Sequence, residues 1–177
     1  KQKGGFYVYI GEGILMAEFP YGQGNFVMDV ILPVEPDGLS STIASVSDAN
    51  YTDWVSNMNK REMEVSFPRF KYGFKKELKD VLSDMGMGIA FSESADFSNI
   101  SEQFDLLIND VTHQTFIETD EEGTEAAAAT VVTVGTTSVG PSALIFKMDH
   151  PFVYIIRETS TNSIIFMGRV ADPSIYD

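Results

Sequence analysis

The chain has 177 residues and a formal net charge of −14, because 26 acidic residues outnumber 12 basic ones. Such an acidic excess argues against nucleic acid or an anionic membrane as a partner, and no apolar run approaches the ~20 residues of a membrane span. There is no cysteine, so the fold needs no disulfide, and the length suffices for one domain with a sizeable core.

Three strand-like segments open the chain at residues 6–10, 14–19 and 25–32, with glycine-rich turns between them. The third is almost continuously apolar and is closed by Pro33, which is typical of a strand buried on both faces. Gly11-Glu12-Gly13 lacks the lysine and the following helix of a phosphate-binding loop, so it predicts a hairpin turn.

Two short helices and a strand are expected next. Residues 33–42 predict a connection and a short helix, and Asp48 is a suitable N-cap for a second helix through Trp54 and Met58. Trp54, the only tryptophan, is expected in the core. Residues 62–67 alternate strictly, which predicts a half-buried strand with Met63, Val65 and Phe67 on one face.

The rest of the chain is expected to contain one helix followed by several strands. Residues 75–85 predict an amphipathic, core-facing helix that Gly86 ends, with its apolar stripe at Leu78, Val81, Leu82 and Met85. Residues 96–100 predict a turn and residues 104–119 a long strand. After residue 142 we expect a short strand at 143–148 and a hairpin of 151–156 with 164–170, the most buried strand pair. The pattern indicates an α+β fold dominated by strands.

The most informative run is residues 121–130, which begins with acid and then holds no side chain larger than threonine except Glu125. Its alanines favour helix, whereas the β-branched residues that follow favour strand. In a strand, alternate side chains form one face without charge or bulk, and Glu125 lies on the other face. Besides Glu122, the run comprises Glu121, Gly123, Thr124, Glu125, Ala126, Ala127, Ala128, Ala129 and Thr130.

This run resembles the reactive-loop hinge of serpins, protease inhibitors whose loop inserts into their own sheet. Residues 67–70, 95–100, 111–114, 151–156 and 166–173 resemble further serpin segments, in the family's order and nearly its spacing. The resemblance implies that residues 1–177 are the C-terminal portion of a single serpin domain, with the reactive loop at about 121–141. The chain is then expected to be a cleavage product or a piece of a longer polypeptide that carries the N-terminal half. An extracellular or cell-surface location is expected on the same ground.

The resemblance also assigns residue roles. Counting from Glu121 by the family's spacing puts the cleaved bond between Thr137 and Ser138, with Val134, Thr136 and Val139 as alternates. A small residue before the bond suits the shallow pocket of an elastase-like or subtilisin-like protease. The resemblance implies that Arg69 grips the carboxylate of Glu121 where insertion begins. It makes His113 the polar residue that holds the sheet closed, whereas the residues alone suggest a core histidine.

No catalytic or metal-binding pattern is visible. The chain has two histidines and no His-Glu-x-x-His motif. Residues 136–140 resemble a nucleophile elbow, but Thr136 stands where the motif needs glycine. Residues 120–122 lack the spacing of a calcium loop. We therefore expect neither an enzyme nor a bound metal or cofactor.

The resemblance implies suicide inhibition of serine proteases, in which the cleaved loop inserts into the sheet and traps the acyl-enzyme. Two alternatives stay open, a non-inhibitory serpin with a binding or chaperone role and an inhibitor of cysteine proteases. Non-inhibitory members usually carry bulky, charged or proline residues in the hinge, and here only the outward-facing Glu125 is of that kind.

Overall fold

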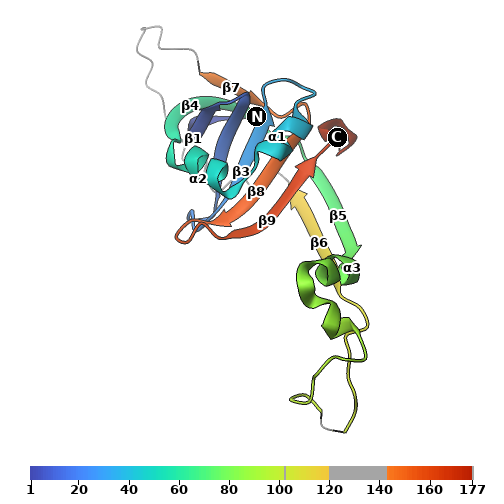
Figure 1. The fold of residues 1–177 in the computed structure, drawn as a ribbon. Coiled ribbons are helices and arrows are strands. Elements are labelled where there is room, and N and C mark those ends of the chain that lie inside the picture. The colour runs from blue at the N-terminus through green and yellow to red at the C-terminus, as the bar shows by residue number, and fades with distance from the viewer. Residues whose placement is uncertain (102, 120–142, 177) are drawn as a thin grey trace, which may run out of the picture. The chain divides into compact units, whose positions relative to one another are not determined.

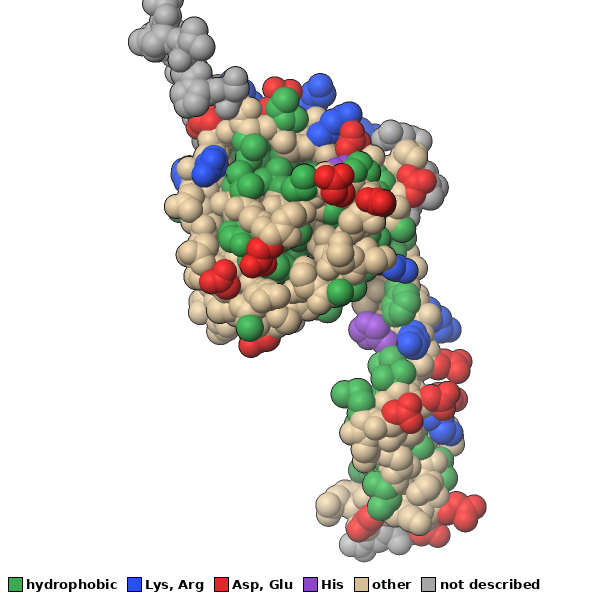
Figure 2. All heavy atoms as spheres, turned by 45° about the horizontal axis from the view of Figure 1, so that its top comes forward, with side chains coloured by type: hydrophobic (Ala, Val, Ile, Leu, Met, Phe, Trp, Pro, Cys, Tyr) green, Lys and Arg blue, Asp and Glu red, His purple; other side chains and the backbone are tan. Residues whose placement is uncertain are grey.

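Figure 1 shows the computed structural model, which describes residues 1–101, 103–119 and 143–176. The chain forms two compact units. The larger unit comprises Lys1–Phe70 and Thr119–Asp177, and the smaller one comprises Lys71–Glu118. Figure 2 shows acidic and basic side chains interspersed on the displayed face, as expected for a surface whose charge serves solubility.

A seven-stranded sheet is the frame of the larger unit, and its order is β7-β4-β1-β2-β3-β8-β9. Neighbouring strands are antiparallel except β4 and β7, which are parallel. The strands are β1 (Gln2–Gly11), β2 (Ile14–Tyr21), β3 (Phe26–Pro33), β4 (Asn59–Ser66), β7 (Leu144–Lys147), β8 (Phe152–Glu158) and β9 (Ile164–Val170). The mixed, strand-rich architecture confirms the predicted fold class.

The opening strands and their first turn are confirmed. Gly11 pairs with Ile14 across the predicted hairpin, and Glu12 and Gly13 have φ angles of 53° and 78°. Gly13 is suited to this left-handed backbone because it has no Cβ. Strand β3 is buried along its length except at Phe26, as expected for a strand with both faces covered.

Helices α1 (Leu39–Ser45) and α2 (Asp48–Ser56) cover one face of the sheet (Figure 1). Trp54 is 1% exposed and packs with Tyr51, Met16 and Ile31, which confirms its core position. The predicted cap of α2 is wrong by one residue. Ser47 is the N-cap, since its hydroxyl accepts from the backbone N–H of Asn50 at 3.2 Å, and Asp48 is the first residue of the helix.

The opposite face of the sheet carries a cluster of aromatic rings. Neighbouring ring centroids lie 5.4 to 6.2 Å apart, a spacing at which aromatic pairs attract each other beyond their burial. Met63 and Val65 point to this side and are buried, as predicted for the alternating strand. The aromatic cluster comprises Phe6, Phe19, Phe67, Phe70, Phe146, Phe152 and Tyr154.

The prediction for the C-terminal hairpin is right in its pairing and wrong in its burial. Strands β8 and β9 are antiparallel, and β8 is largely buried. In β9, however, Ile164 to Met167 are 44% to 57% exposed. Ile164 to Met167 are therefore only partly covered on both faces by the described residues, whereas Val170 at the end of this edge strand is 1% exposed.

The smaller unit departs furthest from the sequence prediction. Strand β5 (Phe70–Glu77) pairs with β6 (Thr112–Thr119). Helix α3 (Lys79–Leu82) continues into Ser83–Met87, where Gly86, with a φ angle of 101°, breaks the helix. Residues 75–77 therefore extend a strand where a helix was predicted, because pairing with β6 outweighs local helix propensity. The predicted stripe is not core-facing, since Val81 and Met85 are 38% and 75% exposed.

Other features of the unit agree in part. The predicted turn at residues 96–100 is confirmed, with Ile100 donating its N–H to the carbonyl of Phe97. The long strand predicted for residues 104–119 is shorter, because only its second half, β6, pairs with another strand. Among the described residues, no helix has the length and apolar character needed to cross a bilayer.

Candidate functional site

The predicted hinge (residues 121–130) and the predicted bond between Thr137 and Ser138 lie outside the described residues, as do the alternates Val134, Thr136 and Val139. The structure instead describes the chain on both sides of this stretch. Strand β6 ends at Thr119 and β7 begins at Leu144. The candidate site is therefore the base on which the two ends of the loop are fixed.

Residues 66–70, here called the anchor segment, hold the strand that leads into the loop. The side chain of Thr119 forms two hydrogen bonds with the backbone of Phe70. Its hydroxyl accepts from the N–H of Phe70 at 3.1 Å and donates to the carbonyl at 3.3 Å. Glu121 follows two residues later. The end of β6, which precedes the predicted hinge in the sequence, is thus bonded to the anchor segment.

The same segment holds the strand that leads out of the loop. Ser66, at the end of β4, pairs with Lys147 of β7. The backbone N–H of Met148 donates to the carbonyl of Ser66 at 3.1 Å. Because Phe70 is 1% exposed and its ring stacks on Phe67, the anchor segment is rooted in the aromatic cluster. The described strands on both sides of the predicted loop are therefore bonded to the same buried segment.

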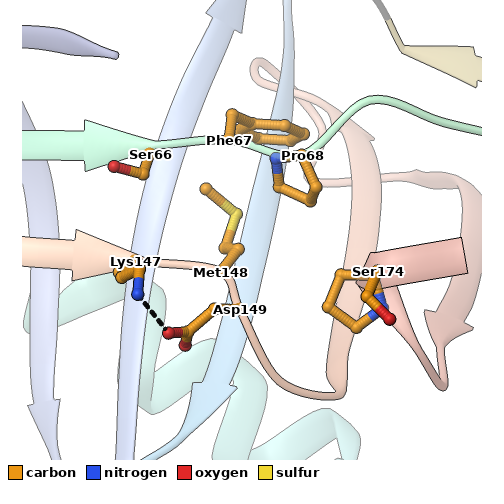
Figure 3. A pocket seen from close by; sticks show the side chains of 8 residues that line it. Ser66, Phe67, Pro68, Lys147, Met148, Asp149 and Ser174 are labelled. Carbon is orange, nitrogen blue, oxygen red and sulfur yellow. Dashed lines mark ion pairs between the residues drawn. The ribbon is translucent and has the colours of Figure 1, made fainter. Parts of the chain in front are cut away.

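A shallow pocket of about 240 Å³ lies beside the anchor segment (Figure 3). Figure 3 shows Met148 pointing toward Phe67, and Lys147 paired with Asp149 at 2.7 Å. Both charged side chains are at least half exposed, so the ion pair contributes little to stability. Lys147, and then His150, lower the pKa of Asp149 through hydrogen bonds. The lining residues are Ser66, Phe67, Pro68, Lys147, Met148, Asp149, Pro173 and Ser174.

This pocket does not have the make-up of a cofactor or metal site. None of its charged side chains is buried, and polar groups that converge on a ligand are the mark of a specific pocket. In the part of the chain that the structure describes, no group of three histidine or carboxylate side chains lies close enough to hold a metal ion. The pocket lies between the anchor segment, the end of β7 and the C-terminal turn at Pro173 and Ser174.

The structure brings one of the two predicted accessory residues to the loop base. Arg69 is exposed and precedes Phe70, the residue bonded to Thr119. This placement puts Arg69 next to the strand end that leads to Glu121, although their ion pair stays a prediction. His113 lies on β6 and is exposed in this chain rather than buried in a core. Its role in holding the sheet closed also stays a prediction.

Several residues of the base were not identified from the sequence. Thr119 ends an alternating strand and carries no motif, and the parallel pairing of β4 with β7 joins residues about eighty positions apart.

A second missed feature is a buried charge cluster around Asp29, which is 0% exposed. A signal for it exists in the sequence, because an aspartate interrupts the otherwise apolar run of β3.

Comparison with known proteins decides the family. The family described as serpin (serine protease inhibitor) matches residues 1–173. The chain belongs to the serpin family. Since that family is described by protease inhibition rather than by catalysis, the expectation that the chain is no enzyme is confirmed.

Relatives from distant animals match this serpin chain. Iripin-5 of Ixodes ricinus is 37% identical over 155 residues, which are 88% of this chain and 39% of the relative. Serpin B4 of Homo sapiens is 39% identical over 158 residues, 88% of this chain and 40% of the relative. The chain therefore spans about 40% of the length of the curated relatives it matches.

Two solved structures agree with the fold. Uncleaved ovalbumin superposes with a TM-score of 0.79 at 31% identity, over 95% of this chain and 42% of that one. A thyroxine-binding globulin in complex with thyroxine gives a TM-score of 0.81 at 27% identity, over 97% of this chain and 45% of that one. The likeness covers nearly the whole of this chain in both cases.

Proposed function

We propose that the complete protein is a suicide-type inhibitor of serine endopeptidases. The observation that carries the proposal is the shared anchor of the loop. Residues 66–70 bind both Thr119 and the end of β7, so the loop between them is presented from a fixed base. The sequence of the loop adds a hinge of small side chains that a sheet can accept.

The proposed mechanism starts with attack on the bond between Thr137 and Ser138, which forms an acyl-enzyme. Cleavage frees the hinge to enter the sheet that contains β6. Strand β6 pairs with β5 on one edge, and its other edge has no strand partner among the described residues. An unpaired edge offers backbone donors and acceptors to an added strand.

The driving force is the conversion of loop into sheet. About a dozen inserted residues gain ladder hydrogen bonds at ~1 kcal/mol net each, and the buried valines add ~25 cal/mol per Å² of apolar area. Insertion carries the acylated protease with it and distorts its active site before hydrolysis. The uncleaved form is then a kinetic trap, so the rate of insertion decides whether the protease is inhibited.

The target that the loop fits best is an elastase-like or subtilisin-like protease. Thr137 is small and β-branched, and it suits a shallow specificity pocket rather than one whose carboxylate requires Arg or Lys. Inhibition of a cysteine protease would use the same trap, because such an enzyme also forms an acyl intermediate. The two target classes are separated by testing one protease of each class.

A binding role is the second candidate function. The structurally similar thyroxine-binding globulin was solved in complex with thyroxine. The hinge favours inhibition over this role, since it contains neither proline nor a bulky residue. Arg69 and His113 are proposed as the residues that restrain the loop and the sheet until cleavage.

The decisive experiment mixes the complete polypeptide that carries this chain with pancreatic elastase and, separately, with subtilisin. A protease–inhibitor complex that survives denaturing electrophoresis supports the proposal, and cleavage without a complex supports the binding role. Mass spectrometry of the small released fragment locates the cleaved bond.

The proposal includes an extracellular or cell-surface location. It also includes the N-terminal half of the same polypeptide as an obligatory partner. Detection of the protein in culture medium tests the location. Co-purification of this chain with the N-terminal half after loop cleavage tests the partnership.

A further inference from the structure

A buried cluster of charged groups joins helix α2 to the sheet at a distance from the loop base. Asp29 of β3 lies at its centre. The Tyr51 hydroxyl donates to Asp29 Oδ2 at 2.5 Å, and Arg157 Nε donates to the same oxygen at 2.8 Å. Because Tyr51 belongs to α2 and Arg157 to β8, one carboxylate oxygen holds two separate elements together.

Arg157 extends the cluster to two further elements. Arg157 Nη2 donates to Glu18 Oε2 of β2 at 2.5 Å, and Arg157 Nη1 donates to Asn162 Oδ1 in the β8–β9 turn at 2.9 Å. The Arg157 side chain is 5% exposed and that of Glu18 is 19% exposed. The Asp29 cluster is defined as Glu18, Asp29, Tyr51, Arg157 and Asn162.

The charges of the Asp29 cluster do not balance. Two carboxylates face one guanidinium, so the ionised cluster has one negative charge in excess. Asp29 Oδ1 is buried and has no hydrogen-bond partner among the described residues. A buried carboxylate that is neither fully paired nor fully bonded is strongly disfavoured in its charged form. Binding of one proton from solvent removes the excess.

Other charged groups around the cluster do not supply the missing balance. The strand neighbour of Glu18 on β1 is Tyr7, and the neighbour of Asp29 on β8 is Ile155. Tyr51 is the titratable side chain that α2 contributes, and Asn162 is neutral. Lys60 of β4 lies in the same row of the sheet, beyond Tyr7, and is exposed. Among the described residues, the ion pairs of both carboxylates are with Arg157.

We propose that proton binding by the Asp29 cluster stabilises the packing of α2 and the β8–β9 turn on the sheet, so that this packing is more stable in mildly acidic solution than at neutral pH. The proton is shared by the two carboxylates and belongs to the pair rather than to either residue. Glu18, the more exposed of the two, is the path by which the proton reaches the cluster.

The direction of the pH effect follows from linkage. Burial raises the pKa of Asp29 above its ordinary value of 3.8, despite the opposing bonds from Tyr51 and Arg157. Burial, and then Asp29, raise the pKa of Glu18 above 4.5. Folding thus binds a proton that the unfolded chain has lost, so this contribution to stability falls as pH rises above about 4.5.

The test compares unfolding of the complete polypeptide with that of Asp29→Asn and Glu18→Gln, each of which keeps its shape and removes one negative charge. In the pH range where the cluster is protonated in the folded state and ionised in the unfolded chain, the unfolding equilibrium constant of the unmodified protein should rise about tenfold per pH unit. Both variants should lose this rise. The matched control is Glu64→Gln, an exposed carboxylate on β4, which should retain it.

A second measurement needs no variant. Hydrogen exchange of the backbone amides of α2 and the β8–β9 turn, corrected for the intrinsic effect of pH on exchange, should show lower protection at pH 7.5 than at pH 5. Equal protection at both values, or the same pH slope in Asp29→Asn as in the unmodified protein, overturns the proposal. Neither result bears on protease inhibition, so the two proposals fail independently.

Discussion

At the scale of single residues, Thr124 tests whether the hinge enters a sheet. In an inserted strand it lies on the face without charge or bulk, so a charged side chain there must be buried. We predict that Thr124→Arg converts an inhibitor into a substrate. An added barrier of only ~1.4 kcal/mol slows insertion about tenfold, so the ratio of trapped complex to cleaved protein should fall at least about tenfold on a denaturing gel.

Glu125→Arg is the matched control for this change. Its side chain lies on the outer face of the inserted strand, in water, and the same charge should leave the ratio nearly unchanged. Equal loss at both positions would contradict strand insertion in this register.

The ion pair of Arg69 with Glu121 is a second residue-scale prediction. Phe70, the neighbour of Arg69, is bonded to Thr119, and Glu121 follows Thr119 by two residues in the sequence. We predict a coupling of ~1 kcal/mol between Arg69 and Glu121, the upper range for an exposed pair. A double-mutant cycle with Arg69→Ala and Glu121→Ala measures it in the uncleaved polypeptide, and Arg69→Lys should keep most of it.

At the scale of elements, the strands whose partners are close in sequence could be predicted. Short turns fix the register of β1, β2 and β3, and alternation marks the buried face of β4. The failures have a different cause. Pairing with β6 decides the state of residues 75–77, and exposure of β9 depends on what covers a sheet edge. Neither property is encoded in the local pattern, because both depend on distant chain segments.

The β8–β9 turn allows an element-scale prediction of acid sensitivity. The Glu158 carboxylate accepts hydrogen bonds from the backbone N–H groups and hydroxyls of Ser160 and Thr161. The Thr161 hydroxyl first, then the two backbone amides, lower the pKa of Glu158 to about 2. Since the folded pKa is depressed, this stabilisation is complete above pH 4.5 and is lost as pH falls through about 2.

Glu158→Gln should therefore remove the acid-dependent part of hairpin stability. Hydrogen exchange of the β8 and β9 amides between pH 5 and pH 2, corrected for intrinsic exchange, measures it. The sign is opposite to that of the Asp29 cluster and the pH window is lower, so the two effects can be separated in one titration. An unchanged acid dependence in the variant would contradict this role for the turn.

At the scale of the whole molecule, the family was predictable from the order of short motifs, whereas the base of the loop was not. The motif at residues 67–70 was visible as a sequence, but its contacts with Thr119 and with β7 join three separate stretches of chain. Such contacts arise from the packing of the sheet. The exposed apolar residues of β9 belong to the same scale, because their exposure depends on what packs against the sheet and not on the pattern of the strand.

The last prediction concerns the free energy that the uncleaved protein stores. If the loop becomes a strand of the sheet that contains β6, cleavage at the bond after Thr137 should raise the melting temperature of the complete polypeptide. A gain of ~12 kcal/mol from ladder hydrogen bonds corresponds to an increase of tens of degrees for a domain of serpin size. Calorimetry before and after limited proteolysis measures it. Thr124→Arg provides the internal control, because its loop is cut but inserts poorly. An equal rise in that variant would assign the stabilisation to something other than insertion, and no rise in the unmodified protein would exclude the inhibitory mechanism proposed here.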